Sequence, residues 1–580
     1  MMPTALRPQL IAALLGAGLG LPAGAQAAAG PAVSTAPGRI AFSVDGGAVQ
    51  DDVDAGGGGH AVALPDGSTL VFGSGAGGPS VLYAAKIGLR GTLDGSTSLP
   101  APSGAASGLL QVLRQPDGKL LLVNEKRESP TQFAPGRLQV TRLNADTTID
   151  RSYGAGGTAT SGVNIGCGSC TVAALQPDGA VVLTGTTGEI PRTPAPLSLR
   201  WAVTRLTASG AVDQAFGAGG VATIATPGSA SGFNVAIGAG GAITTEAQLE
   251  SAGKSTLLLA RLKSSGAPDP TFAGGAPVAV PFASGFLLLV QDDGSIVLNG
   301  QLAGSPVPTT TPRRQLLARY TAAGAPDPAF GSGGFVDLGP QIEPTQLLAA
   351  AGRPVLVVGE KAVALAPGSF PEPGRLNIRL VASNGAIDQG RTVDLPFGGG
   401  GSSFLVSIRP RPVASLFQNG FVGNRLVRRA DGSYLIPGGV SVSQPTGEGT
   451  GFSIGRFAAA ALTPALTLDT AFGGPAAPLG LSIRVPRQRA TTARSRHGIR
   501  VVLKSSAVGL AKVRITAGGR TIAHSLLPVF KTRAHTLPVE LTRYGNTYLR
   551  RHRHVRVTVR ANARDLVAST ATATARGRLP

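Results

Sequence analysis

Two short turn patterns alternate along most of the chain, and their recurrence restricts the fold more than any other feature. The first is a Pro-Asp-Gly-type turn between two apolar runs, complete or degenerate at 65–67, 116–118, 177–179, 239–241, 292–294, 351–353 and 430–432. Proline fixes φ, aspartate can bond its own backbone, and glycine accepts a positive φ. The pattern therefore predicts a tight turn between two short strands at each position.

The second pattern is an aspartate followed three residues later by an aromatic ring. It occurs as Asp150 with Tyr153, Asp213 with Phe216, Asp269 with Phe272, Asp327 with Phe330 and Asp469 with Phe472, and without the ring at Asp94 and Asp388. A strand with a central arginine precedes most copies, as in residues 141–143 and 204–206. We expect the aspartate to form an Asx-type turn and the ring to pack between sheets.

The spacing of these turns predicts a ring of similar sheets. Asp66, Asp117 and Asp178 are 51 and 61 residues apart, which leaves room for four short strands per repeat, and no strong helical period separates them. Residues 57–479 are therefore predicted to form an all-β β-propeller of seven four-stranded blades, with an insertion at 398–417. In the preceding segment, 28–56, residues 39–44 are predicted to be a strand that completes a blade made mostly by the far end of the propeller.

The combined pattern resembles the delta-60 repeat of secreted bacterial proteins. The best matches are residues 115–122 with 142–157, 176–183 with 205–220, and 319–334. The resemblance covers about 57–474, and the first, third and sixth copies depart from it. It implies a β-propeller and brings no catalytic residues with it.

The N-terminus has the pattern of a secretory signal peptide, residues 1–27. Arg7 precedes an apolar run, Leu10 to Leu21, that is too short to span a bilayer, and Ala25-Gln26-Ala27 is a typical cleavage site. We therefore expect a secreted or cell-surface protein with no transmembrane segment after cleavage.

Residues 480–580, called the C-terminal module below, are strongly basic. Residues 481–580 hold 21 of the 52 Lys and Arg residues but only 2 of the 31 acids. Alternating patterns at 498–503, 511–516 and 555–559, with a short helix in 541–549, predict a small Ig-like β-sandwich. Its layout is similar to that of C-terminal Ig-like modules of secreted actinobacterial proteins. Two interpretations of its charge stay open: a solvated face, or a polyanion-binding surface that includes Arg550, Arg551, Arg553, Arg556 and Arg560.

Few residues offer other chemistry. Cys167 and Cys170 lie in a glycine-rich loop rather than at a helix start, which favours a local disulfide over a redox or zinc site. The repeated aspartates lie one per repeat, too dispersed for calcium, and we expect no metal or cofactor.

These features predict a monomeric, non-enzymatic binding or scaffolding protein. Its expected partner is an acidic cell-envelope polymer or a surface protein, not nucleic acid. The alternative is an extracellular hydrolase or lyase acting on glycan, with two carboxylates facing each other in the central channel.

Overall fold

The computed structural model describes most of the chain after the predicted signal peptide. The described residues are 33–36, 39–42, 58–75, 78–99, 105–126, 136–164, 170–188, 199–251, 254–285, 287–302, 315–339, 343–349, 354–361, 375–388, 391–394, 404–405, 426–445, 451–475, 478–507, 509–529, 534–552, 554–565 and 570–580. The predicted signal peptide lies outside them, as does all of the predicted insertion 398–417 except 404–405.

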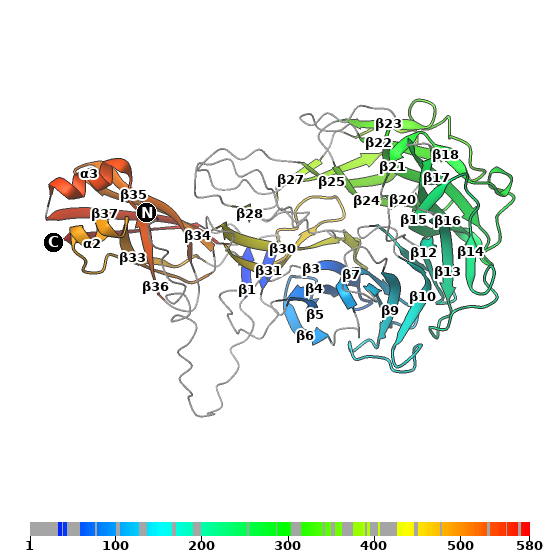
Figure 1. Cartoon of the computed structure of the whole chain (residues 1–580), viewed down its shortest axis with the longest axis horizontal. Coiled ribbons are helices and arrows are strands. Elements are labelled where there is room, and N and C mark those ends of the chain that lie inside the picture. The colour runs from blue at the N-terminus through cyan, green and yellow to red at the C-terminus, as the bar shows by residue number, and fades with distance from the viewer. Residues whose placement is uncertain are drawn as a thin grey trace, which may run out of the picture.

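Short strands joined by tight turns form successive antiparallel groups (Figure 1). The first two are β3 (Gly58–Ala63), β4 (Thr69–Gly75), β5 (Gly78–Ile87) and β6 (Leu93–Leu99), then β7 (Ala105–Arg114), β8 (Leu120–Lys126), β9 (Arg137–Leu143) and β10 (Thr158–Asn164). The next two are β11 (Ala173–Leu175), β12 (Val181–Thr187), β13 (Arg200–Leu206) and β14 (Val221–Thr223), then β15 (Ser229–Ile237), β16 (Ile243–Ser251), β17 (Lys254–Leu262) and β18 (Val278–Val280). One pair, Asn164 with Thr186, links β10 to β12.

Two further groups follow the same plan. They are β19 (Phe282–Ser284), β20 (Leu288–Val290), β21 (Ile296–Leu302), β22 (Gln315–Tyr320) and β23 (Phe335–Gly339), then β24 (Glu343–Ala349), β25 (Val355–Lys361), β26 (Arg375–Val381) and β27 (Arg391–Asp394). Two single 3-10 turns lie in loops between strands: η1 (Ala239–Gly241) between β15 and β16, and η2 (Ala273–Gly275) between β17 and β18. The first strands of neighbouring groups contact one another in the order β3, β7, β11, β15, β20, β24, and β29 contacts β3. The protein is an all-β β-propeller, as predicted from the repeats.

The last propeller sheet joins distant parts of the chain. It contains β1 (Val33–Ala36), β2 (Arg39–Phe42), β28 (Phe404–Leu405), β29 (Val427–Arg428), β30 (Tyr434–Pro445) and β31 (Gly451–Leu462). β2 pairs antiparallel with β31, so that Arg39 lies opposite Ala460. The predicted closing strand in 39–44 is confirmed over Arg39–Phe42, while the blade number of seven stays a prediction.

Strands in the middle of a group are apolar on both faces because a sheet covers each side. In β8, residues Leu120 to Val123 are all at most 1% exposed. Trp201 of β13 is fully buried, as expected of a core residue, and its indole N–H donates to Thr245 Oγ1 at 3.4 Å. Packing between neighbouring sheets thus forms the propeller core.

The C-terminal module has a hydrophobic core of its own, which lies between two sheets. One sheet holds β32 (Leu481–Arg484), β33 (Gly498–Ser505) and β36 (His535–Glu540); the other has the order β35 (Arg520–Val529), β34 (Gly509–Ala517), β37 (Val555–Asp565), β38 (Thr570–Leu579). Two helices, α2 (Ala490–Ser495) and α3 (Arg543–Arg551), pack against them. The three strands and the helix expected from the sequence are confirmed. An Ig-like relationship stays a prediction.

Candidate functional site

The repeated aspartates form turns in the structure. In the first pattern, Asp66 Oδ1 accepts the backbone N–H of Ser68 at 2.9 Å, and the same bond recurs from Lys119 to Asp117 and from Ala180 to Asp178, each at 3.0 Å. In the second pattern, Asp150, Asp213, Asp269, Asp327 and Asp469 each accept the N–H two residues later. The Asx-turn prediction is therefore confirmed for both patterns.

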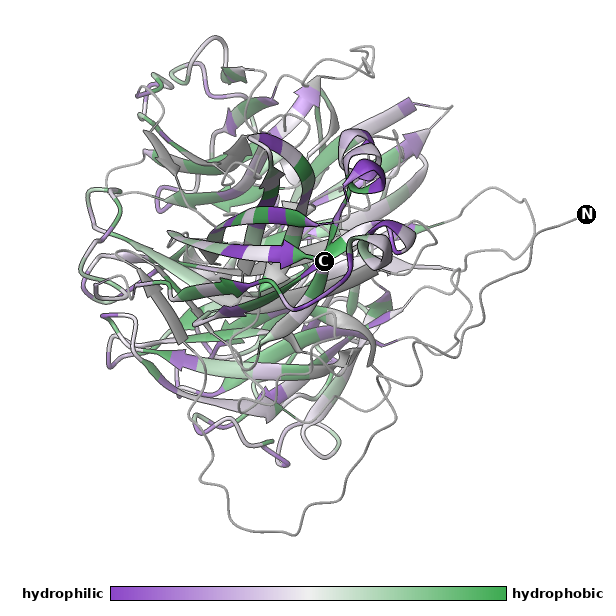
Figure 2. Cartoon of the chain, turned by 90° about the vertical axis from the view of Figure 1, so that its left-hand side faces the viewer, coloured by the Kyte–Doolittle hydropathy of each residue, from purple (hydrophilic) through white to green (hydrophobic). Residues whose placement is uncertain are grey.

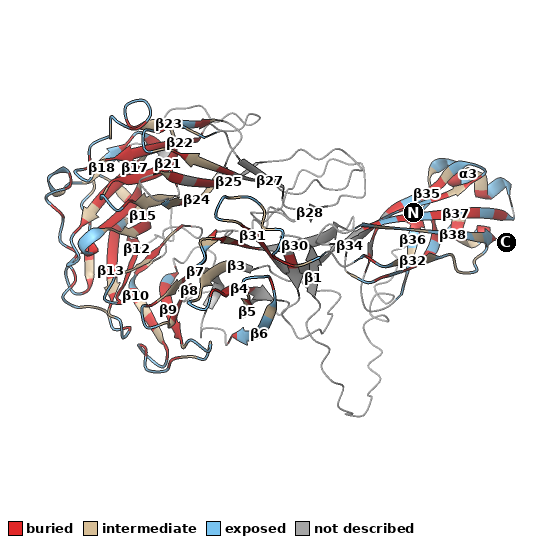
Figure 3. Cartoon of the chain, turned by 180° about the vertical axis from the view of Figure 1, so that it is seen from behind, coloured by how far each residue is buried: buried red, intermediate tan, exposed pale blue. Residues whose placement is uncertain are grey.

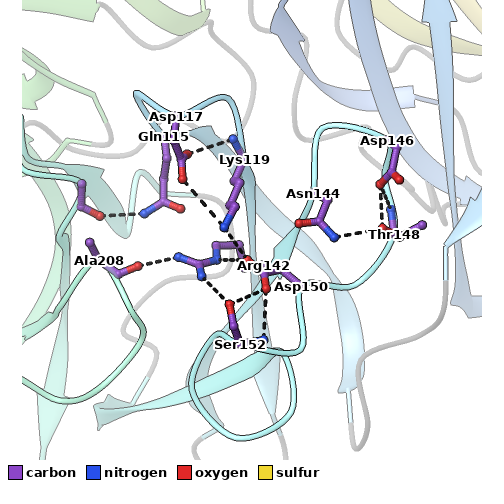
Figure 4. A network of polar contacts seen from close by, with 11 residues as sticks. Gln115, Asp117, Lys119, Arg142, Asn144, Asp146, Thr148, Asp150, Ser152 and Ala208 are labelled. Carbon is purple, nitrogen blue, oxygen red and sulfur yellow. Dashed lines mark hydrogen bonds and ion pairs between the residues drawn. The ribbon is translucent and has the colours of Figure 1, made fainter.

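The arginine before the second turn ties that turn to the next repeat (Figure 4). Arg142 Nε donates to Asp150 Oδ2 at 2.9 Å, and its Nη1 donates to the carbonyl of Ala208 at 2.6 Å. Its guanidinium also lies over the Tyr153 ring, 4.6 Å from the centroid. One side chain thus joins the strand, the turn and the neighbouring repeat. We call this arrangement the blade joint.

The blade joint recurs in other repeats. The Arg Nε to Asp Oδ2 distance is 2.7 Å for Arg261 with Asp269, 2.8 Å for Arg319 with Asp327 and 3.3 Å for Arg205 with Asp213. Arg261 and Arg319 lie over Phe272 and Phe330, with the guanidinium carbon 5.1 and 4.4 Å from the ring centroids. The sequence showed these arginines as a recurring strand residue, but their pairing with the aspartate eight positions later was not predicted.

Backbone hydrogen bonds complete the joint. The N–H after each aromatic residue donates to a carbonyl in another repeat: Gly154 to Ser209, Gly217 to Ser265, Ala273 to Ala323, Gly331 to Asn384 and Gly473 to Arg90. The last bond connects the final repeat to the first. Glycine is required at the receiving turn, because a Cβ on Gly210 (φ +88) would lie 2.9 Å from the Tyr153 ring.

Hydrogen bonds and charge pairing lower the pKa of one joint aspartate, Asp150. The hydrogen bonds that Lys119 and Ser152 donate, together with the positive charge of Arg142, hold the pKa of the Asp150 carboxyl well below its usual range. Lys119 Nζ lies 2.8 Å from Asp150 Oδ2. The ionised Asp150 carboxylate thus has two cationic partners at its joint.

Glu246 is the one acid among the described residues whose pKa is strongly raised. It lies fully buried on β16, and burial raises the pKa of its carboxyl to about 8. Asn234 Nδ2 donates to Glu246 Oε2 at 2.8 Å, while the N–H of Thr171 donates to Asn234 Oδ1 at 2.8 Å. Glu246 and Asn234 therefore connect β16 and β15 to Thr171, which lies just before β11. The Glu246 carboxyl has no contact with solvent.

The structure describes one of the two cysteines. Cys170 is 3% exposed and is disulfide-bonded. Cys167, the other half of the predicted pair, lies outside the described residues. Within the described part of the chain, no cluster of three or more His, Cys, Asp or Glu side chains is placed to hold a metal ion.

The described members of the predicted basic set lie on two elements, α3 and β37. Arg550 and Arg551 are exposed in the last turn of α3, and Arg553 lies outside the described residues. Arg556 and Arg560 are exposed on β37, where Val555, Val557 and Val559 point inward (Figure 3).

Strand pairing adds basic residues that the sequence analysis did not single out. Arg514 of β34 lies opposite Arg560, and Arg578 of β38 lies opposite Arg556. Lys512 and Arg576 lie on the same exposed face, which we call the basic face. Figure 2 looks onto the C-terminal end of the molecule and shows hydrophilic segments alternating with apolar ones along strands near the C-terminus. The alternating polar and apolar residues of β34 and β38 could have pointed to an exposed basic face. The sequence did not show that these two strands pair with β37.

Comparison with known proteins agrees with the fold. Residues 240–272 match the model of a β-propeller family described as a domain of unknown function, DUF5122. No curated protein matches the chain. Among the described residues, no helix combines the length and apolar character that crossing a membrane requires.

Several solved structures are similar at low identity. A polysaccharide lyase, Uly1, is 11% identical with a TM-score of 0.37, over 70% of this chain and 90% of that one. PorZ, a surface component of the type-IX secretion system of Porphyromonas gingivalis, is 11% identical with a TM-score of 0.25, over 95% and 80%. An N11 neuraminidase-like protein from a flat-faced bat influenza virus is 9% identical with a TM-score of 0.30, over 76% and 99%.

Proposed function

We propose that this protein is an exported, non-enzymatic binding protein that is retained at an acidic surface outside the cell by its C-terminal module. The observation that carries the proposal is the basic face. There, one side of a sheet exposes Arg514, Arg556, Arg560, Arg576 and Arg578, and none of the ion pairs between described residues involves them. A surface of this kind attracts polyanions.

The propeller serves as a rigid scaffold in this proposal. Its most frequently repeated polar residues are used in turns and blade joints, and in the described part of the propeller the same inter-repeat hydrogen bond occurs at five places, including the bond from Gly473 to Arg90. Such a ring can present its variable loops without changing shape.

The alternative function is that of a hydrolase or lyase acting on an extracellular glycan, with two carboxylates that reach the substrate. Glu246 has the raised pKa that a general acid requires, but it is fully buried and its described partner is an amide. Because its burial keeps Glu246 away from any substrate, we retain binding as the proposal.

Co-sedimentation with purified cell envelopes across a salt series tests the proposed function. The mature chain is compared with a chain ending at residue 479, which keeps every described propeller core cluster intact. We expect only the mature chain to pellet and high salt to release it. Equal pelleting of both chains, or pelleting of neither, contradicts the proposal, and in the second case release of reducing ends from envelope glycan is assayed next.

A further inference from the structure

The basic face arranges its charges in a diagonal band rather than evenly. The strand register gives four successive rows of outward residues: Arg556 with Arg578, Thr558 with Thr516 and Arg576, Arg560 with Arg514, and Asn562 with Lys512. The positively charged residues therefore lie on β38 and β37 in the first rows and on β37 and β34 in the last rows. In the last two rows the β38 positions are Thr574 and Thr572, which are exposed and uncharged, so the band does not include this part of β38.

The band has the dimensions of an extended polymer segment. From the row of Arg556 to the row of Lys512 the band extends over six residue-to-residue steps of β37, which is about 20 Å along the strands, and it crosses two strand spacings, or about 10 Å. Most neighbouring charges are separated by one strand spacing or by two residues of a strand, about 5 to 7 Å. The diagonal step from Arg576 to Arg560 is about 8 Å. A single small anion would contact only one or two of these residues.

Two pairs in the band place like charges directly opposite each other. These are Arg514 with Arg560 and Arg556 with Arg578. Such pairs destabilise an antiparallel sheet in the absence of a counterion. Beneath them, Val513, Val557, Val559 and Ala561 are at most 2% exposed, so the sheet is anchored on the core and cannot easily move the charges apart.

We infer that the band binds a linear acidic polysaccharide that carries a carboxylate on its repeating sugars. This inference rests on the proposed function and specifies its ligand. Arginine forks match carboxylates in a bidentate geometry, and the neighbouring Thr516, Thr558 and Asn562 side chains offer hydrogen bonds to sugar hydroxyls. His524 of β35 lies opposite Arg514 and is the ring next to the band in the described register. The paired rings of the module lie at α3, where Tyr548 stacks on His552 and Tyr544 is tilted against Tyr548, with centroids 4.2 and 5.7 Å apart.

Titration of the full mature chain with alginate, a linear polyuronate, tests this inference. The probes are alginate fractions of increasing length, free galacturonate, and inorganic polyphosphate at equal total charge. The band variant combines Arg514→Ser and Arg560→Ser. The control combines Arg484→Ser and Arg500→Ser, two exposed arginines on the other sheet of the module, so both variants lose the same charge.

We expect alginate to bind more tightly as its length approaches that of the band, and galacturonate to bind too weakly to measure. The band variant should raise the Kd for long alginate at least 10-fold and lower the slope of log K against log salt by about 2, whereas the control should change the Kd less than 2-fold. Because the band variant removes a like-charge pair, its thermal transition should not fall, and this measurement separates lost binding from lost folding.

Three results would overturn the inference. Equal losses in the band variant and the control would mean that net charge alone drives binding. Tighter binding of polyphosphate than of alginate would identify a different class of ligand. Salt-sensitive pelleting with envelopes, combined with no alginate binding by the unaltered chain, would leave the proposed function standing and remove this ligand.

Discussion

In three blade joints, a guanidinium contacts a carboxylate and an aromatic ring at the same time. Arg319 shows this most clearly, because it is 1% exposed, lies 2.8 Å from Asp327 and covers the Phe330 ring. A buried pair of this kind contributes little compared with an apolar replacement, but removal of one partner leaves the other charge unpaired.

Arg319→Ala should therefore destabilise the propeller by about 3 kcal/mol, since Asp327 loses its partner and Phe330 its cover. Differential scanning calorimetry of the full chain would show this as a lower transition temperature of the propeller. Arg428→Ala is the matched control, because Arg428 is exposed on β29, and it should change the stability by less than about 0.5 kcal/mol. Similar effects of the two substitutions would contradict a structural role for the joint.

Glu246 predicts a dependence of stability on pH. Its pKa is about 8 in the folded protein and 4.5 when unperturbed, so between these values the folded chain holds a proton that the unfolded chain has released. Its contribution is complete below about pH 4.5 and is lost as the pH rises through 8. Glu246→Gln keeps a neutral acceptor for Asn234 and should flatten this dependence, measured as the transition temperature at pH 5 and pH 8. An unchanged pH profile in the variant would rule out Glu246 as the source.

At the scale of elements, a close approach fixes helix α3 on the C-terminal module. A Cβ on Gly545 would lie only 1.8 Å from the carbonyl oxygen of Ile522, a residue of β35. Thr542 caps the helix by accepting the N–H of Gly545 at 2.9 Å. The glycine thus allows the first turn of α3 to touch the sheet.

Gly545→Ala should therefore destabilise the module, although alanine normally stabilises a helix interior by about 0.5–1 kcal/mol relative to glycine. Asn546→Ala, at the exposed neighbouring position, should be neutral or stabilising. Chemical denaturation followed by the fluorescence of a dye that binds exposed apolar surface would compare the two. The prediction fails if Gly545→Ala raises the denaturation midpoint.

Local chemistry explains how much of these elements could be predicted. The Asp-Gly turns, the alternating strands of the module and the short helix depend on neighbouring residues, and they appear where the sequence places them. The pairs Arg142 with Asp150 and Arg514 with Arg560 depend on a turn geometry and on strand register. Neither is set by residue type alone, so the joint and most of the basic face were not predicted.

At the scale of the whole molecule, both ends of the repeat region contribute to one sheet. β2 pairs with β31, Gly473 donates to the carbonyl of Arg90, and Arg429 Nη1 donates to the carbonyl of Leu89 at 2.8 Å. These contacts close the ring by backbone bonds and by a buried arginine.

Removal of β1 and β2 should open this closure. A chain that begins at residue 43 should show a lower transition temperature for the propeller and an unchanged transition for the C-terminal module, whose core is separate. A chain that begins at residue 33 is the control and should behave like the mature protein. Identical propeller transitions in the two truncated chains would show that the β2–β31 pairing contributes nothing to stability.

The pairing of Arg39 with Ala460 also determines when the propeller can finish folding. During synthesis, the first strands emerge long before their partner, and a contact between residues so distant in sequence slows the rate-limiting step. In the meantime the N-terminal hairpin exposes an unpaired strand edge to other chains. The β2–β31 pairing completes the finished ring. Until it forms, β2 is thus also the strand at which the nascent chain is most open to mispairing with a second copy.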